Sequence, residues 1–322
     1  MKIESVILSS DSNPEYIDFW PMVSRQWHKT GIKPVLCYLR AANDDKYISR
    51  EYGEVIDYDL VEEIPASLQG QVLKIFHASS CGENVVMTSD MDLLPTPIPE
   101  NANCSLYQQW VKDVDDNKYV NAGDGTSSDN RFTLCYHIAK SKVFKKVLGI
   151  SDTWEGFVTS IFELSHDQDW RKQTEMLGIP VNNLRRRADV PWNMDEMWIS
   201  RKMMEYPDQG IFHYPAISRG GILVRRTWSY DADLLRQGYY THIGLPRPYK
   251  KYRWLCEAAI HYQPIPSFFL KWCRLAKRLF NLHRFHRRTA LRKPTRLVYK
   301  LTDKLYLNSL NFYFRMKGTG AQ

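Results

Sequence analysis

The most constraining feature of this sequence is the alternation of short β-rich runs with helical stretches over its first hundred residues. Residues 16–29 and 66–79 carry apolar side chains at helical spacing. Between the helical stretches lie four runs with the composition of strands: Ser5–Ser9, Lys33–Leu39, Glu54–Tyr58 and Asn84–Thr88. Because strands that alternate with helices form a mostly parallel sheet covered on both faces, the sequence predicts an α/β fold.

Two aspartates, Asp90 and Asp92, follow the fourth of these runs directly. Sheets of this class bind ligands just outside the carboxyl ends of their strands, where the chain turns and both carboxylates can converge on one cation. Mg²⁺ and Mn²⁺ prefer carboxylate and phosphate oxygens, and such a cation would neutralise a leaving diphosphate. A D-x-D tripeptide is common by chance, so a solvated acidic turn is the alternative. The position at a strand end favours a cation site.

The first strand ends in Ser9, Ser10 and Asp11, and together with the D-x-D strand it resembles the nucleotide-sugar half of GT-A glycosyltransferases. The resemblance implies a Rossmann-like mixed sheet with helices on both faces. It also implies that the end of the first strand contacts the nucleoside and that the D-x-D pair binds the metal and the diphosphate. In that superfamily the helix before the D-x-D strand lends a basic or polar side chain, and Lys74 occupies the comparable helix.

A second segment, residues 241–249, resembles the His-x-x-Gly-x-x-Lys-Pro-Trp segment of retaining glycogenin-like enzymes. One residue is missing between His and Gly here, and Arg and Tyr replace Lys and Trp. In that family the histidine is a third metal ligand and the lysine meets the diphosphate, so the resemblance assigns these roles to His242 and Arg247. A guanidinium suits the second role because its fork of donors can hold phosphate oxygens. A surface or structural role for His242 is the alternative.

Two acidic clusters in the helical region after the sheet are candidates for a catalytic or acceptor-binding carboxylate. We rank Asp195 and Glu196 first, because Trp192 and Trp198 flank them as expected near a sugar. Residues 167–169, Asp-Gln-Asp, resemble the Asp-Gln pair of the glycogenin-like family, but they also suit a solvated helix start. In inverting enzymes a carboxylate deprotonates the acceptor, and in retaining enzymes a polar group stabilises an oxocarbenium-like transition state. The sequence leaves open whether the reaction inverts or retains the configuration at the sugar's reacting carbon.

The formal net charge of +8 comes from one segment. Residues 271–300 carry eleven Lys and Arg and no acid, whereas the rest of the chain has 33 basic and 36 acidic residues, a net charge of −3. Residues 267–288 place aromatic and basic side chains on opposite helical arcs. This pattern suits an anionic membrane surface better than nucleic acid, although the apolar arc could instead pack on the rest of the protein. We expect a catalytic domain over 1–262 and a basic, amphipathic helical region over 263–322.

Three classes of function follow from these patterns. The favoured one is a Mn²⁺- or Mg²⁺-dependent glycosyltransferase that moves a hexosyl or pentosyl group from a nucleotide-diphosphate donor to a glycan or lipid-linked glycan. The second is a metal-dependent phosphoryl-transfer hydrolase, but haloacid-dehalogenase-like enzymes need Thr or Val where Leu94 stands. The third is a non-catalytic, membrane-associated scaffold of the same fold. Because no leader or long apolar run is visible, we expect a cytoplasmic location, with peripheral contact to the cytoplasmic membrane face.

Overall fold

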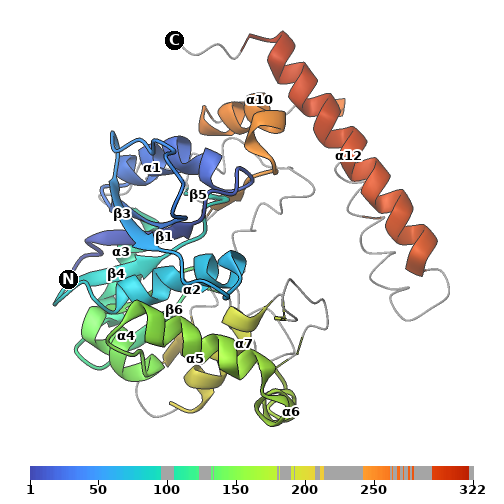
Figure 1. Ribbon diagram of the computed structural model, residues 1–322. Coiled ribbons are helices and arrows are strands. Elements are labelled where there is room, and N and C mark those ends of the chain that lie inside the picture. The colour runs from blue at the N-terminus through green and yellow to red at the C-terminus, as the bar shows by residue number, and fades with distance from the viewer. Residues whose placement is uncertain are drawn as a thin grey trace.

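The predicted α/β architecture is confirmed by a computed structural model, in which a seven-stranded mixed sheet has helices on both faces (Figure 1). The strand order is β3-β2-β1-β4-β7-β6-β8, and β7 runs antiparallel to both of its neighbours. The described residues are 1–95, 105–122, 132, 134–179, 181, 190–191, 193–206, 211–213, 242–261, 263, 267–268, 271, 275, 278 and 292–318.

The four strands expected from the sequence are all present, with ends shifted by one residue at most. The strands of the main sheet are β1 (Ser5–Ser10), β2 (Lys33–Arg40), β3 (Glu54–Asp59), β4 (Val85–Thr88), β6 (Tyr119–Asn121), β7 (His137–Lys140) and β8 (Ile211–His213). The sequence also predicts a strand over residues 131–138, and its bounds are wrong, because the observed strand β7 begins only at His137. Residues 121–130 are rich in Gly, Asn, Asp and Ser, which predicts a loop. That prediction is wrong at Asn121, which ends β6, and residues 123–130 lie outside the described chain.

Helices cover both faces of the sheet because its central strand is buried on both sides. Val6 and Leu8 of β1 pack into one hydrophobic cluster and Ile7 into the other. The first cluster includes residues of α1 (Trp20–Lys29), α10 (Tyr249–Ile260) and α12 (Arg292–Met316). The second includes residues of α2 (Ala66–Ala78), α4 (Ser141–Leu148), α5 (Trp154–His166), α6 (Gln168–Met176) and α7 (Met194–Met204). Short helical turns complete the described elements: η1 (Ile17–Phe19), α3 (Leu106–Gln109) and η2 (Trp110–Asp113).

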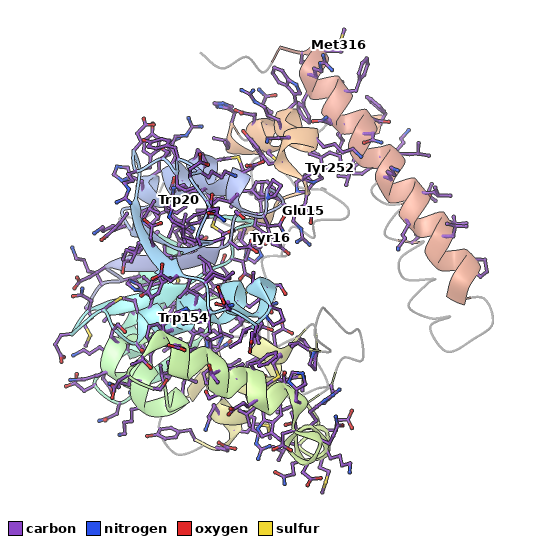
Figure 2. All side chains as sticks on the ribbon, in the orientation of Figure 1. Glu15, Tyr16, Trp20, Trp154, Tyr252 and Met316 are labelled. Carbon is purple, nitrogen blue, oxygen red and sulfur yellow. The ribbon has the colours of Figure 1, made fainter. Side chains whose placement is uncertain are left out.

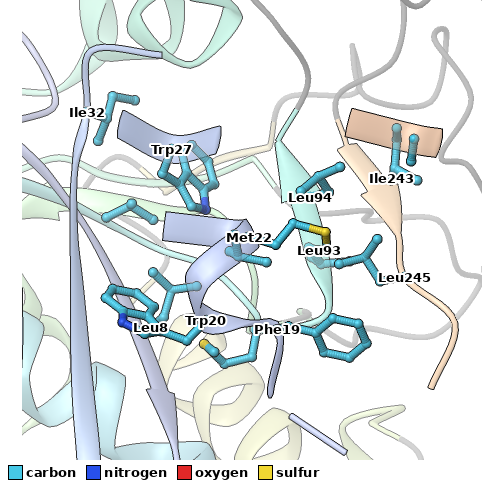
Figure 3. Packing of buried hydrophobic residues seen from close by; sticks show 14 of the residues in the cluster. Leu8, Phe19, Trp20, Met22, Trp27, Ile32, Leu93, Leu94, Ile243 and Leu245 are labelled. Carbon is cyan, nitrogen blue, oxygen red and sulfur yellow. The ribbon is translucent and has the colours of Figure 1, made fainter. Parts of the chain in front are cut away.

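A second, two-stranded sheet lies on the α1 side and consists of β5 (Leu93–Pro95) and β9 (His242–Gly244). The apolar side chains of β5 pack beside α1: Figure 3 shows Leu93 and Leu94 next to Met22, with Ile243 and Leu245 beyond them. This packing fixes the segment that follows β9 against the chain that follows β4.

Three predictions about helices differ from the structure in their bounds or fall partly outside the described residues. The helix expected over 16–29 starts at Trp20, after the single 3-10 turn η1. The sequence predicts a helical region over residues 154–204 that is broken at Pro180 and Pro191. The structure adds a break at Asp167 and starts α7 at Met194, after Pro191, whereas Pro180 lies outside the described residues. Most of the basic helix expected over 267–288 also lies outside them. Within the residues that the structure describes, no helix is long and apolar enough to cross a bilayer.

Gly53 lies where the chain enters β3 and is packed too tightly for any side chain. A Cβ there would lie 2.7 Å from the Pro34 carbonyl oxygen and 2.9 Å from the Trp20 ring. We expect Gly53→Ala to lower the free energy of unfolding by about 1–3 kcal/mol, because backbone and a buried indole must shift. The matched control is Gly70→Ala in α2, whose nearest neighbour would be 3.8 Å away and which should gain up to ~1 kcal/mol. Urea unfolding measures both, and equal stability of the two variants would contradict the expectation.

Candidate functional site

The acidic pair lies at the carboxyl edge of the central strands. The backbone N–H of Ser89 donates to the Ile7 carbonyl oxygen over 3.0 Å, so the chain continues the β1 pairing beyond the end of β4 before it turns. Asp90 and Asp92 then occupy the turn between β4 and β5. The Asp90 side chain is 37% exposed, whereas that of Asp92 is only 3% exposed. One carboxylate therefore faces solvent and the other is held inside.

Lys74 lies on the inner side of α2 and forms an ion pair with Asp90. Its ammonium also donates to the Ser89 carbonyl oxygen at 3.3 Å. Burial alone would lower the pKa of Lys74, but the charge and hydrogen bond of Asp90, with a smaller contribution from Asp195, hold that pKa above its ordinary value. Lys74 is therefore a buried cation beside the acidic pair, and its role toward a nucleotide sugar stays a prediction.

Arg247 reaches the second aspartate from a distant part of the sequence. The Leu245 N–H donates to the Asp92 carbonyl oxygen over 2.8 Å, which extends the β5–β9 pairing to the site. Arg247 then places its Nε 3.5 Å from Asp92 Oδ2, and its guanidinium stacks on the Tyr16 ring, 4.7 Å from the centroid, while donating to the Tyr16 hydroxyl. Figure 2 labels Tyr16 next to Glu15, on the side of the sheet domain that faces Tyr252 of α10. Each aspartate of the pair thus has a basic partner.

The two ranked carboxylates lie in the first turn of α7. Asp195 is buried, and its charge makes a smaller contribution than Asp90 to holding the pKa of Lys74 above its ordinary value. Glu196 is only partly buried. Trp198, by contrast, packs in the core against Phe157, with ring centroids 5.4 Å apart, so it is not a platform for a sugar. Trp192 lies outside the described residues.

The end of β1 lies at the same edge because β1 and β4 are parallel neighbours. Ser9 donates from Oγ to the Gly70 carbonyl oxygen at 2.6 Å and so fastens the strand to α2. Ser10 donates from Oγ to the Asp11 carbonyl oxygen over 2.9 Å. The Asp11 carboxylate accepts a hydrogen bond of 3.1 Å from the Asn13 N–H. These contacts order the loop after β1 beside the acidic pair.

His242 is buried in β9, where the register pairs it with Pro95 rather than with the acidic pair. Its ring lies 5.4 Å from the ring of Tyr136, a residue with φ of 61°. Burial raises the pKa of Tyr136 strongly, and the charge of Asp90 contributes to that shift. Within the described chain, no three His, Cys, Asp or Glu side chains gather closely enough to hold one ion. The role of His242 as a third ligand stays a prediction.

The donors at this edge nevertheless fit a small hard cation. Mg²⁺ is usually held by one or two carboxylates together with substrate phosphates rather than by a complete protein cage. Asp90 and Asp92 supply two carboxylates at one turn, and the exposed Asp90 leaves room for further oxygen ligands. These two residues would hold the cation.

The other acidic cluster has a structural role. Asp167 is the N-cap of α6, and its carboxylate accepts 2.9 Å hydrogen bonds from the N–H groups of Asp169 and Trp170. This confirms the interpretation of residues 167–169 as a helix start. Sequence reasoning missed Tyr16 and Tyr136, which contact Arg247 and His242. No pattern in the sequence marks either tyrosine, because each is brought to the site only by the tertiary fold.

No protein-family model matches this sequence, and no curated protein matches it. Solved structures similar to it include the glycosyltransferase GlyE of Streptococcus pneumoniae TIGR4, with 14% identity over 68% of this chain and 46% of that one and a TM-score of 0.39. The apo form of GlyE has 15% identity over 66% of this chain and 45% of that one, with a TM-score of 0.37. This chain thus spans less than half of the GlyE chains. The galactosyltransferase LgtC, in complex with donor and acceptor sugar analogs, has 13% identity over 82% of this chain and 98% of that one, with a TM-score of 0.42.

Proposed function

We propose that this chain is a metal-dependent glycosyltransferase that transfers a hexosyl or pentosyl group from a nucleotide-diphosphate sugar to a glycan or lipid-linked glycan. The observation that supports the proposal is the pairing of two carboxylates with two cations at one sheet edge. Asp90 contacts Lys74, and Asp92 faces Arg247. Carboxylates are ligands for a cation, and ammonium and guanidinium groups bind phosphate oxygens. Together they suit a substrate that carries both a metal ion and a diphosphate.

Each side chain has a distinct task in this proposal. Asp90 and Asp92, with His242 as a further ligand, hold Mn²⁺ or Mg²⁺, which when bound supplies Lewis-acid stabilisation of the leaving diphosphate. Arg247 binds the diphosphate through its fork of donors, and Tyr16 keeps the guanidinium in place by stacking. Lys74 orients Asp90 through their ion pair and would supply positive charge to the diphosphate oxygens.

The acceptor side of the reaction falls to the first turn of α7. Asp195 is buried close to Lys74, and Glu196 is the more exposed of the two. We assign Glu196 to the acceptor hydroxyl and Asp195 to the donor's reacting carbon. In an inverting reaction Glu196 would take the acceptor proton, whereas in a retaining one Asp195 would stabilise positive charge on the sugar. The loop after β1, with Ser9, Ser10 and Asp11, would contact the nucleoside.

The proposal includes a cytoplasmic location with peripheral contact to the membrane through residues 267–300. A phosphoryl-transfer hydrolase is less well supported, because Leu94 is buried in β5 where those enzymes need a Thr or Val. A non-catalytic scaffold would keep the fold and lose the cation.

A donor screen tests the proposal. A ligand that binds only the native state raises the melting temperature, by about 5 °C when present at ~100 times its Kd. With a panel of nucleotide sugars, we expect one class of donor to give such a shift with Mn²⁺ and a much smaller one without it. Release of nucleoside diphosphate from that donor would separate an enzyme from a scaffold. Absence of a shift with every donor, or phosphate release from simple phosphomonoesters, would count against a glycosyltransferase.

A further inference from the structure

Helix α12 is anchored to the rest of the protein by one apolar face. Tyr306, Leu310 and Phe314 are buried in the same hydrophobic cluster as α10 and the β1 core. Polar contacts fix the docking, because the Asn311 side chain accepts from the Leu255 N–H over 3.3 Å and donates to the Lys251 carbonyl oxygen over 2.8 Å. The orientation of the helix about its own axis is therefore set.

The opposite face of α12 is also apolar and is exposed. Its large side chains leave between 53% and 70% of their surface open to solvent: Leu297, Leu301, Leu305, Phe312 and Met316. On a helical wheel this stripe lies roughly 180° from the buried face. Three side chains of the stripe (Leu305, Phe312 and Met316) line an open groove of about 480 Å³ together with Phe268, Asn308, Ser309 and Tyr313. Figure 2 shows Met316 at the end of α12 that lies nearest α10. A large exposed apolar face of this kind is typical of a surface that binds a partner or a membrane.

Positive charge borders this stripe. Over residues 292–316 the sequence has six basic residues and one acidic residue. Among the described side chains, Lys300, Lys304 and Arg315 are exposed close to the stripe, and Lys271 and Arg278 are exposed on the preceding segment. An apolar stripe with a basic border matches the interface of a bilayer, where the acyl chains are apolar and the anionic headgroups are negative.

We propose that the exposed face of α12 binds the surface of a bilayer containing anionic phospholipid, with the helix lying in the plane of the interface. A second copy of the chain is the other candidate for a partner that covers this face. A two-fold contact would bring the same basic border against itself, however, and like charges would repel. A lipid surface instead supplies the opposite charge. The proposal concerns residues 297–316, beyond the 267–288 helix inferred from sequence, and it holds whether or not the chain transfers a sugar.

The test is co-sedimentation of the full chain with vesicles of two compositions. One is phosphatidylcholine alone, and the other is an equal mixture of phosphatidylcholine and phosphatidylglycerol. We expect binding to the mixed vesicles that weakens as salt is raised. The triple variant Leu301→Ser, Leu305→Ser, Phe312→Ser should bind roughly a hundredfold more weakly, because three side chains no longer enter the interface. The affinity of the double variant Lys300→Glu, Lys304→Glu for the mixed vesicles should be at least about tenfold lower.

Controls separate loss of the face from loss of the fold. Met176→Ser removes an exposed apolar side chain from α6, away from the stripe, and should bind like the unaltered chain. The triple variant should keep its melting temperature, since the side chains it changes are exposed. Failure of the unaltered chain to bind mixed vesicles, or equal binding by the triple variant, would overturn the proposal. So would a dimer of the unaltered chain, measured by light scattering, that the triple variant makes monomeric without any vesicle binding.

Discussion

Asp92→Asn is expected to lower kcat/KM for donor turnover by about a thousandfold or more while leaving the fold intact. The amide keeps the size of the carboxylate but loses the charge that would hold the cation and that faces Arg247 Nε at 3.5 Å. Because the side chain is almost fully buried, water cannot easily replace it as a ligand. The measurement is release of nucleoside diphosphate from the donor that the screen identifies.

The variant's fold and its site can be followed separately. Arg247 keeps its contact with Tyr16 in Asp92→Asn, so we expect circular dichroism to be unchanged and the free energy of unfolding to fall by no more than about 1 kcal/mol. The Mn²⁺-dependent thermal shift with donor should disappear. Asp169→Asn, which neutralises an exposed aspartate in α6, is the matched control and should retain full activity. Activity of Asp92→Asn within a few-fold of the unaltered chain would remove Asp92 from the donor site.

The sequence predicted those parts of the site that depend on one strand and its end. Asp90 and Asp92 follow an apolar run, and the carboxyl edge of a sheet is where such a run delivers them. Lys74 followed from the resemblance, and its contact with Asp90 agrees with it. The match of residues 241–249 to a known segment likewise brought Arg247 to attention, and the structure places it beside Asp92.

What the sequence could not predict depends on long-range packing. The small β5–β9 sheet is built from strands of three residues, too short for a periodic pattern, yet it is what carries Arg247 to Asp92. The same holds for β6, another strand of three residues. Tyr16 stacks on a guanidinium 231 residues away, and no local signal marks that contact. The position of Trp198 beside the acidic residues favours an interpretation as a sugar platform. The same pattern is equally common for aromatic residues that pack in a core, and Trp198 is one of these.

The Lys74–Asp90 pair is expected to give an asymmetric pair of stability effects. Lys74 is almost fully buried, whereas Asp90 is 37% exposed. Asp90→Asn removes the negative charge that pairs with the buried Lys74 ammonium, so we expect the free energy of unfolding to fall by about 2 kcal/mol. Lys74→Met removes the buried ammonium and leaves an Asp90 carboxylate that water can reach, so a loss of only about 0–1 kcal/mol is expected. Urea unfolding at neutral pH measures both.

The double variant decides whether the asymmetry comes from the buried charge. Once Lys74 is methionine, no ammonium is left to desolvate, so adding Asp90→Asn should cost almost nothing and the two changes should couple by about 1.5 kcal/mol or more. The exposed pair of Lys33 and Glu54 is the control, and Glu54→Gln should cost less than about 1 kcal/mol. Additive effects at Lys74 and Asp90 would show that the pair is not coupled in solution.

The pH dependence of the same variants follows from the sign of the Lys74 shift. In the unaltered chain the folded-state pKa of Lys74 lies above its unfolded value, so the pair stabilises the fold fully below about pH 10.4 and loses that effect as the pH rises through the folded-state pKa. In Asp90→Asn, burial works against the ammonium and only the smaller contributions of Asp195 and Cys135 oppose it, so the folded-state pKa of Lys74 should fall. The cost of burying the ammonium should then shrink as the lysine deprotonates. The difference in unfolding free energy between the two chains should therefore narrow steadily in alkaline solution. A difference that stays constant with pH would mean that Asp90→Asn acts through lost packing rather than through the charge of Lys74.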